Sequence, residues 1–264
     1  MKKVLFLIII CLISLGCKSK PTMEIEKPNV VIYDKIIEMV RIPAGVFQNS
    51  SPVRIDSFFL GKYLVTQKEY LDVMKTNPSF FKGDLLPVEN ISFIDVIEFC
   101  NRLSIREGLT PAYVISEDSI TWNRESNGYR LPTDIEWEHA CRAGTITPFN
   151  TGNNITTDQA NFDGRFPYNG NTRMEYRQKT TPVGTFSANR WGLHDMHGNV
   201  WEWCWEGPNG NGTDNYSIQL NNSICVIRGG AWSSSGVSLH SSYRSGFRPN
   251  VRNNYVGFRI ARSL

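Results

Sequence analysis

The sequence predicts an α+β domain with long irregular loops, and three observations support this prediction. Capping boxes, in which a Ser or Thr is followed three residues later by an acid, mark helix starts at Thr66, Ser92 and Thr133. Short runs rich in β-branched and aromatic residues lie before and after these helices and are typical of strands. Residues 145–185 are rich in Gly, Asn, Thr and Pro with little apolar periodicity, which indicates either a surface excursion or a loop held by a metal ion.

The strands are predicted from both ends of the chain. Residues 30–41 are expected to form the opening strand and residues 53–60 a second one. In residues 200–205 three tryptophans alternate and share one face, which favours a buried aromatic ladder over an exposed binding platform. Residues 226–228 form a short strand, and residues 255–260 are predicted as a closing strand that pairs with the first strand.

Two of the three predicted helices show an apolar stripe. The helix that begins after Ser92 ends near Gly108, and the helix that begins after Thr133 ends near Gly144, because glycine accepts the left-handed conformation that closes a helix. The stripes consist of Phe93, Val96, Ile97, Cys100 and Leu103 on the former and of Trp137, Ala140 and Cys141 on the latter.

The N-terminus predicts export. Two lysines precede an apolar run, residues 4–13, that is too short to span a bilayer, so residues 1–16 are interpreted as a signal peptide. Small residues before Cys17 resemble a bacterial lipobox, which implies lipidation of Cys17; a plain signal peptide is the alternative. Residues 17–29 are polar and form a tether. We therefore expect an exported, lipid-anchored protein at the outer membrane or cell surface.

Charge and cysteine content exclude two other classes. The formal net charge of +3 does not indicate a nucleic-acid partner. The four cysteines beyond the tether are widely spread without a C-x-x-C pair, which argues against zinc and leaves their pairing open. They are Cys100, Cys141, Cys204 and Cys225.

The segment of residues 226–259 has an unusual composition. Between residues 233 and 256 there is no Asp, Glu, Lys, Gln, Met, Trp or Cys, and the only charged residues are Arg244, Arg248 and Arg252. Ser, Gly, Asn and Tyr dominate, as they do in antibody binding loops, although an ordinary Ser-rich loop would look similar. The segment also shows no helical or strand periodicity, so it is predicted as an irregular loop on a rigid support.

Five motifs in order resemble one family. They are MVRIPAG at residues 39–45, YRLPTDIEWE at 129–138, GLHDMHGNVWEW at 192–203, RGG at 228–230 and GFR at 257–259. The chain resembles the formylglycine-generating-enzyme (sulfatase-modifying factor) family, whose domains are an elaborated C-type-lectin fold. The resemblance implies one such domain over residues 30–264.

The resemblance does not carry over the family's catalysis. Its oxidases bind copper(I) through two cysteines, and the matching positions hold Ser234 and Leu239, which cannot replace soft thiolate ligands. We therefore predict no copper and no formylglycine-generating activity. The histidines do not match the iron site of the ergothioneine-type relatives either, and His194 and His197 are interpreted as loop residues.

The resemblance also implies structural calcium. One site would use carboxylates of Asp195 and Glu202 with backbone carbonyls of Gly198 and Val200, oxygen donors that suit calcium. A hydrogen-bonded turn without metal is the alternative. A weaker second site would use Asn161, Phe162, Glu175 and Arg177, with Glu175 where the family has Asp.

The position of the segment resembles the variable proteins of diversity-generating retroelements, most closely the variable lipoprotein of a treponemal one. In these proteins adenine-directed rewriting of asparagine codons never produces Lys, Glu, Gln, Met or Trp, and residues 233–256 lack all five. The resemblance implies a non-catalytic binder of an unknown protein or surface ligand, with Trp232, Arg244, Gly257 and Phe258 as support. The exchangeable ligand-binding residues would be Ser233, Ser234, Ser235, Val237, Ser238, His240, Tyr243, Ser245, Gly246, Phe247, Arg248, Val251, Asn253 and Tyr255.

Two alternatives remain open from the sequence. One is a structural lipoprotein of a cell-envelope or secretion assembly with the same fold. The other is an enzyme of unrecognised chemistry, for which the segment offers serines and His240 but no ordered third group.

Overall fold

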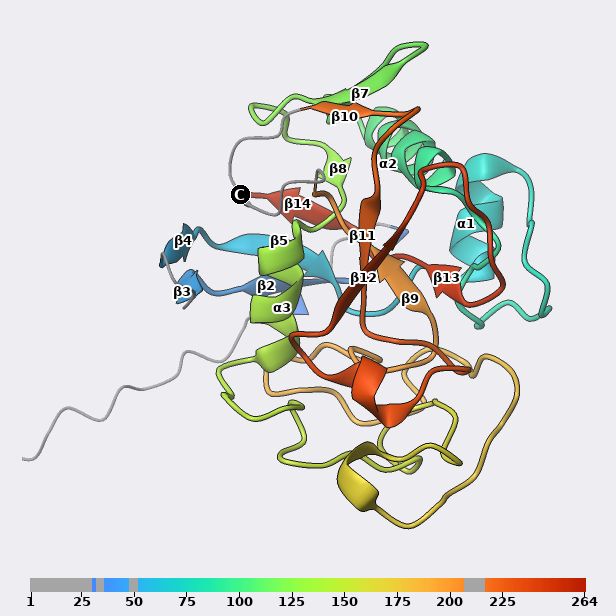
Figure 1. Cartoon of the computed structure of the whole chain (residues 1–264). Coiled ribbons are helices and arrows are strands. Elements are labelled where there is room, and N and C mark those ends of the chain that lie inside the picture. The colour runs from blue at the N-terminus through green and yellow to red at the C-terminus, as the bar shows by residue number, and fades with distance from the viewer. Residues whose placement is uncertain (1–29, 32–35, 48–51, 207–216) are drawn as a thin grey trace, which may run out of the picture.

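The computed structural model describes residues 30–31, 36–47, 52–206 and 217–264 (Figure 1). The predicted signal peptide, Cys17 and the tether lie outside these residues, so the structure leaves those predictions where they were. No helix within the described ranges is long and apolar enough to cross a bilayer.

One antiparallel sheet joins the two ends of the domain, in the order β1-β2-β5-β14-β8. The predicted opening strand comprises β1 and β2, and the predicted second strand is divided into β4 and β5 by Asp56 and Ser57. The bounds are β1 Val30–Val31, β2 Met39–Ile42, β4 Val53–Ile55, β5 Phe58–Gly61, β8 Tyr129–Arg130 and β14 Ala261–Ser263.

The predicted partner of the closing strand was wrong. β14 pairs with β5 and β8, while the residues just before it form β13, Val256–Gly257, in another sheet. The reason is that β5 occupies the edge of β2 along its whole length, from Met39 opposite Gly61 to Ile42 opposite Phe58. The C-terminal strand therefore joins the free edge of β5.

A second sheet carries the segment of interest, in the order β12-β11-β9-β13. Its strand β12 was missed from sequence, because a strand of Arg, Ser, Gly and Phe has no apolar alternation. The bounds are β9 Trp201–Trp203, β11 Cys225–Arg228 and β12 Arg244–Phe247. Two small sheets complete the set, from β6 Tyr113–Ile115, β7 Ser119–Trp122 and β10 Ser217–Gln219, and from β3 Gly45–Phe47 with β4.

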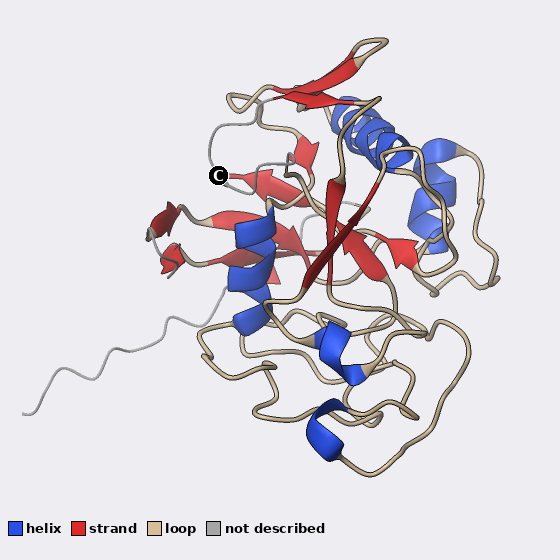
Figure 2. Cartoon of the chain, in the orientation of Figure 1, coloured by secondary structure: helices blue, strands red, loops and turns tan. Residues whose placement is uncertain are grey.

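All three predicted helices are present (Figure 2). Each begins with both hydrogen bonds of a capping box. They are α1 Gln67–Met74, α2 Phe93–Arg106 and α3 Asp134–Arg142. The predicted apolar stripes of α2 and α3 are buried, and Gly108 and Gly144 follow the helix ends with positive φ. Residues 145–185 are irregular as predicted, apart from the short helix η1 Tyr168–Gly170.

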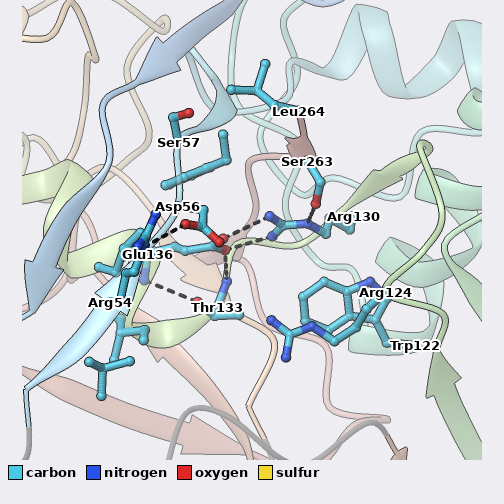
Figure 3. A pocket seen from close by; sticks show the side chains of 14 residues that line it. Arg54, Asp56, Ser57, Trp122, Arg124, Arg130, Thr133, Glu136, Ser263 and Leu264 are labelled. Carbon is cyan, nitrogen blue, oxygen red and sulfur yellow. Dashed lines mark hydrogen bonds and ion pairs between the residues drawn. The ribbon is translucent and has the colours of Figure 1, made fainter.

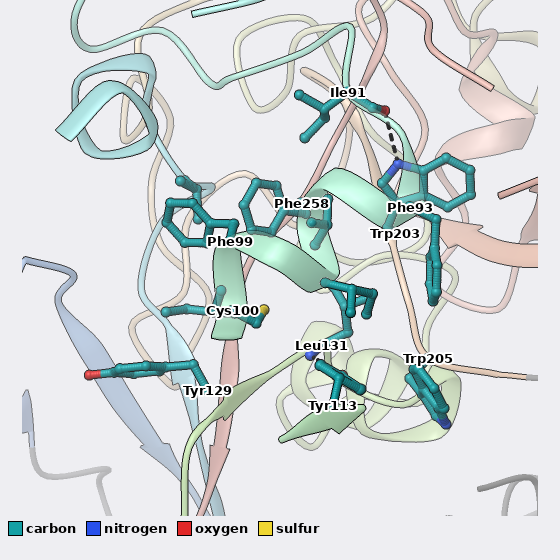
Figure 4. Packing of buried hydrophobic residues seen from close by; sticks show 14 of the residues in the cluster. Ile91, Phe93, Phe99, Cys100, Tyr113, Tyr129, Leu131, Trp203, Trp205 and Phe258 are labelled. Atoms are coloured by element: carbon teal, nitrogen blue, oxygen red, sulfur yellow. Dashed lines mark hydrogen bonds between the residues drawn. The ribbon is translucent and has the colours of Figure 1, made fainter. Parts of the chain in front are cut away.

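The alternating tryptophans form the predicted buried ladder. Trp201, Trp203 and Trp205 are each less than 10% exposed and belong to the main apolar cluster. Figure 4 shows Phe93 of α2 against Trp203, whose indole N–H donates to the carbonyl of Ile91 at 3.3 Å. The four cysteines predicted to lie in this domain are all buried and unpaired.

Candidate ligand-binding surface

The segment of residues 226–259 begins at a buried arginine on β11. The guanidinium of Arg228 forms ion pairs with Asp134 and Glu138 of α3. It also donates to the backbone carbonyls of Ser241 and Tyr243, at 3.2 and 3.1 Å. Because these acceptors are backbone atoms, this contact holds the segment whatever side chains it carries.

A second buried arginine ends the segment. Arg259 is fully buried and binds both carboxylate oxygens of Glu202, at 2.6 and 2.9 Å, together with the carbonyls of Gly61 and His194. The indole of Trp137 donates to the same carboxylate at 2.8 Å. Three of the sequence motifs therefore meet at Glu202.

The irregular region and the start of α2 hold the backbone between these arginines. The contacts are hydrogen bonds between main-chain atoms, so they do not depend on side-chain identity. They run from Asp163 N to Ser234 O at 3.0 Å, Gly236 N to Phe166 O at 2.8 Å, Ser241 N to Pro148 O at 2.8 Å, Asn90 N to Asn253 O at 2.9 Å and Phe93 N to Pro249 O at 3.0 Å.

None of the fourteen predicted ligand-binding residues is buried. Interspersed positions that were not in the set, among them Leu239 and Ser241, are fully buried. The exposed members are Ser233, Val237, Tyr243, Ser245 and Arg248, and the half-buried ones are Ser234, Ser235, Ser238, His240, Gly246, Phe247, Val251, Asn253 and Tyr255. The structure thus brings the predicted residues together on one solvent-facing segment.

Gly246 is the exception to exchangeability within this set. A Cβ added there would lie 2.5 Å from the side chain of Ile224 and 2.9 Å from the backbone oxygen of Cys225. The carbonyl belongs to the paired strand β11 and cannot move without disturbing the ladder. Sequence alone could not reveal this, because the crowding comes from a strand pairing that was not predicted.

The arginines within the segment are mostly neutralised by the scaffold. Arg244 pairs with Glu206 at 2.7 Å, and Arg252 pairs with Asp95 at 2.8 Å. Arg248 has no ion pair among the described residues. Arg244 is thus held by an ion pair with the scaffold, although its side chain is 42% exposed.

The remaining predicted support residues are held as expected. Gly257 and Phe258 are buried, and a Cβ at Gly257 would lie 2.5 Å from the carbonyl of Val88. Trp232 is half-buried and donates its indole N–H to the carbonyl of Asn254 at 3.1 Å.

An aromatic ridge adjoins the segment and was not predicted. It is a continuous series of ring and cation–π contacts with centroid distances of 4.2 to 6.1 Å. Its two ends are markedly exposed, Phe80 at 68% and Phe166 at 59%. A usable sequence signal was the Phe80–Phe81 pair inside a non-helical loop. The ridge consists of Phe80, Phe81, Trp232, Tyr176, Arg165 and Phe166.

The first predicted calcium site fits only in part. Asp195 is buried with one oxygen accepting from the Gly184 N–H and Oδ1 without a hydrogen-bond partner among the described residues, and burial raises its pKa to about 6. Glu202, however, has both oxygens engaged by Arg259 and Trp137. Gly198 and Val200 are buried in the same turn. As arranged, this set resembles the hydrogen-bonded turn that was the alternative.

The second predicted calcium site also fits only in part. Asn161 is fully buried, and its Oδ1 has no partner among the described residues, as a metal donor would require. The buried Phe162 follows it. Glu175 does not fit, because its side chain is 62% exposed and pairs with Arg177 at 3.0 Å. Calcium at either position stays a prediction.

The positions of the family's copper ligands have other roles here. The Ser234 hydroxyl accepts the Ala231 N–H at 3.0 Å, and Leu239 is buried in an apolar cluster with Phe149. The nearby thiol of Cys141 is buried, and burial raises its pKa to about 12.

The two histidines predicted to be loop residues bind the backbone. His197 is buried, its Nδ1 lies 2.7 Å from the carbonyl of Leu239, and burial lowers its pKa to about 4. His194 is 2.7 Å from the carbonyl of Phe186.

A pocket of about 250 Å³ lies between β5, β14 and the start of α3 (Figure 3). Arg130 in it binds Glu136 through two nitrogens, at 2.7 and 2.8 Å, and donates to Ser263 Oγ at 3.1 Å. Its lining contains none of the fourteen predicted ligand-binding residues. We therefore assign it to the scaffold.

Comparison with known proteins decides the family. The model of the sulfatase-modifying factor enzyme 1-like domain matches residues 32–264. The chain belongs to the formylglycine-generating-enzyme family. This confirms the predicted family and the predicted α+β fold with its C-type-lectin-like elaboration.

Three proteins illustrate what this chain is similar to. The chaperone protein LppX of Paenibacillus barcinonensis is 36% identical over 256 residues, which is 86% of this chain and 89% of LppX. Treponema denticola variable protein 1 superposes with a TM-score of 0.73 and 26% identity, covering 90% of this chain and 99% of that protein. PvdO from Pseudomonas aeruginosa superposes with a TM-score of 0.66 and 26% identity, covering 90% of this chain and 100% of PvdO.

Proposed function

We propose that this family member is a non-catalytic, lipid-anchored surface protein that binds a protein ligand through the exchangeable side chains of residues 233–255. The observation that carries the proposal is the contrast between the fixed backbone of the segment and its solvent-accessible side chains. Its backbone is fixed by Arg228 and by main-chain hydrogen bonds, whereas all fourteen predicted contact residues reach solvent. A surface of this kind can change its side chains without losing its shape.

Two further facts support the proposal. The chain is similar over most of its length to a treponemal protein named as variable, and the segment lacks the five residue types that adenine-directed exchange does not produce. The aromatic ridge adds a constant part to the surface, since aromatic and arginine side chains are enriched in protein interfaces. Exposed apolar side chains such as Phe80 and Phe166 favour protein over nucleic acid as the partner.

A second candidate is a chaperone, favoured by the 36% identity to LppX. A chaperone would contact its client through fixed residues such as Phe80 and Phe166, whereas a diversified binder would use the segment. The structural lipoprotein of an envelope assembly remains the third possibility, with a fixed segment.

The flanking DNA separates these functions. We expect a reverse-transcriptase gene nearby and a non-coding near-copy of the codons for the segment, with mismatches confined to adenines of that copy. Envelope or client genes without a near-copy would instead support one of the other two functions.

A biochemical test uses the exposed positions. Joint replacement of Ser233, Val237, Tyr243, Ser245 and Arg248 by other small or polar residues should lower the melting temperature by no more than about 10 °C. Exposed substitutions usually change stability by less than about 0.5 kcal/mol each, or about 2.5 kcal/mol for all five. The matched control is the single buried change Leu239→Ser, which should lower it further than the five together. Unfolding of the five-residue variant would contradict the proposal.

A further inference from the structure

Strand β12 is the outer strand of its sheet in the part of the chain that the structure describes. Within the described residues it pairs only with β11, from Arg228 opposite Arg244 to Cys225 opposite Phe247. β9 pairs with the opposite edge of β11. In Figure 1 the ribbon of β12 crosses in front of β11. Arg244 and Ser245 are exposed and Gly246 is half-buried, so solvent reaches this edge.

The hydrogen-bond pattern shows which backbone groups point outward. Cys204 N donates to Val226 O at 2.9 Å, so the backbone groups of Val226 face β9. In an antiparallel sheet, consecutive residues direct their N–H and C=O to opposite sides. Those of Cys225 and Ile227 therefore face β12, where they meet Phe247 and Ser245.

It follows that Arg244 and Gly246 direct their N–H and C=O away from β11. No backbone partner for these four groups is present among the described residues. This arrangement is complementary to one particular structure, which is another extended chain with the same spacing of donors and acceptors.

We propose that this edge binds an extended, acidic segment of the partner protein, which adds a strand beside β12. The inference rests on the proposed function and specifies how the segment engages its ligand. Added strands obtain affinity from main-chain hydrogen bonds and specificity from side-chain contacts. The main-chain part survives exchange of side chains, so each diversified copy keeps a common mode of attachment.

The charges beside the edge favour an acidic chain. Arg248 follows the strand directly, is exposed and has no ion pair among the described residues. Residues 229–258 contain no acid, so the strand and its neighbours in the chain add no negative charge beside Arg248. Tyr243, which directly precedes the strand and is exposed, offers aromatic surface for a side chain of the partner.

Amide hydrogen exchange of the free protein is the first test. We expect the amides of Arg244 and Gly246 to exchange at least about tenfold faster than those of Ser245 and Phe247, because only the latter are in the ladder. Equal protection of all four amides would overturn the proposal.

Peptide binding is the second test. The probe is an acetylated octapeptide of alternating Glu and Val, with a Lys–Val octapeptide and a fully N-methylated Glu–Val octapeptide as controls. We expect the Glu–Val probe alone to bind and to slow exchange at Arg244 and Gly246. No binding, equal binding of the N-methylated peptide, or binding without protection of these amides would overturn the edge mechanism. If the five-residue variant above still folds in that case, the proposed function stands.

A matched pair of variants isolates the backbone donor. Gly246→Ala and Gly246→Pro introduce the same crowding at Cβ, but only proline removes the outward N–H. We expect the proline variant to bind the Glu–Val probe about threefold to tenfold more weakly than the alanine variant. Equal affinity of the two variants would contradict the proposal. If the proline variant fails to fold, the N-methylated peptide still tests the main-chain hydrogen bonds, because it removes the backbone donors of the peptide instead of the donor of the protein.

Discussion

The two arginines that bracket the variable segment differ sharply from the three inside it. Arg228 and Arg259 are at most 2% exposed, and each binds carboxylates and backbone carbonyls from distant parts of the chain. Arg244, Arg248 and Arg252 lie at the surface. The same side chain thus fixes the frame at the ends of the segment and remains available to solvent within it.

The difference shows how a loop of about thirty residues keeps one shape while its side chains are exchanged. Its cohesion comes from the bracketing arginines and from main-chain hydrogen bonds with the irregular region. Exposed ion pairs contribute little to stability, typically about 0–1 kcal/mol, whereas removing one partner of a buried pair costs about 3–5 kcal/mol.

The largest expected effect is at the end of the segment. Arg259→Met should lower the free energy of unfolding by about 3–5 kcal/mol, because it leaves the buried carboxylate of Glu202 without a cation. Urea unfolding measures this loss. The double variant Arg259→Met with Glu202→Gln should recover part of this loss. If Arg259→Met alone were as stable as the wild type, the buried Arg259 would not stabilise the fold.

Two buried glutamates differ in whether an arginine neutralises them. Glu202 has Arg259, but Glu89 is fully buried with only main-chain donors described, and burial raises its pKa to about 7. Between pH 4.5 and 7 the unfolded chain has released this proton while the native chain retains it, so stability should fall as pH rises through that window.

Replacement of Glu89 by glutamine should remove this pH dependence of stability. Glu89→Gln should raise the free energy of unfolding at pH 8 by about 1–3 kcal/mol, since one pKa unit corresponds to about 1.4 kcal/mol. Glu202→Gln is the matched control and should destabilise at the same pH. Urea unfolding from pH 5 to 8 tests both, and a Glu89→Gln variant that retains the wild-type slope would refute the assignment.

Local signals predicted more of this molecule than non-local ones. Thr66, Ser92 and Thr133 marked helix starts because a capping box is complete within four residues. Strand β12 was missed because it exists only through its pairing with β11, and the partner of the closing strand was wrong for the same reason.

Within the candidate site, composition located the segment but not its details. The resemblance to the family, rather than composition, separated exposed Tyr243 from buried Phe258. The crowding at Gly246 and the proximity of Phe80 to Trp232 depend on how distant loops pack, which residue patterns do not encode.

A smaller effect is expected inside the segment. Arg248→Ala and Arg252→Ala together should change the free energy of unfolding by less than about 1 kcal/mol, because Arg252 forms a half-exposed pair and Arg248 none among the described residues. Thermal and urea unfolding of the double variant provide the measurement. A loss of unfolding free energy as large as that of Arg259→Met would show that the surface arginines of the segment stabilise the fold as much as the buried Arg228 and Arg259 do.

The smallest effect is expected from chelation of calcium. Because Arg259 already neutralises Glu202, the turn around Asp195 has charge compensation without a metal ion. Thermal unfolding with and without a chelator should therefore give melting temperatures within about 2 °C, equivalent to about 0.5–1 kcal/mol for a domain of this size. A larger fall, abolished by Asp195→Ala, would show that the unpartnered Oδ1 of Asp195 binds calcium and that the frame depends on the ion as well as on the bracketing arginines.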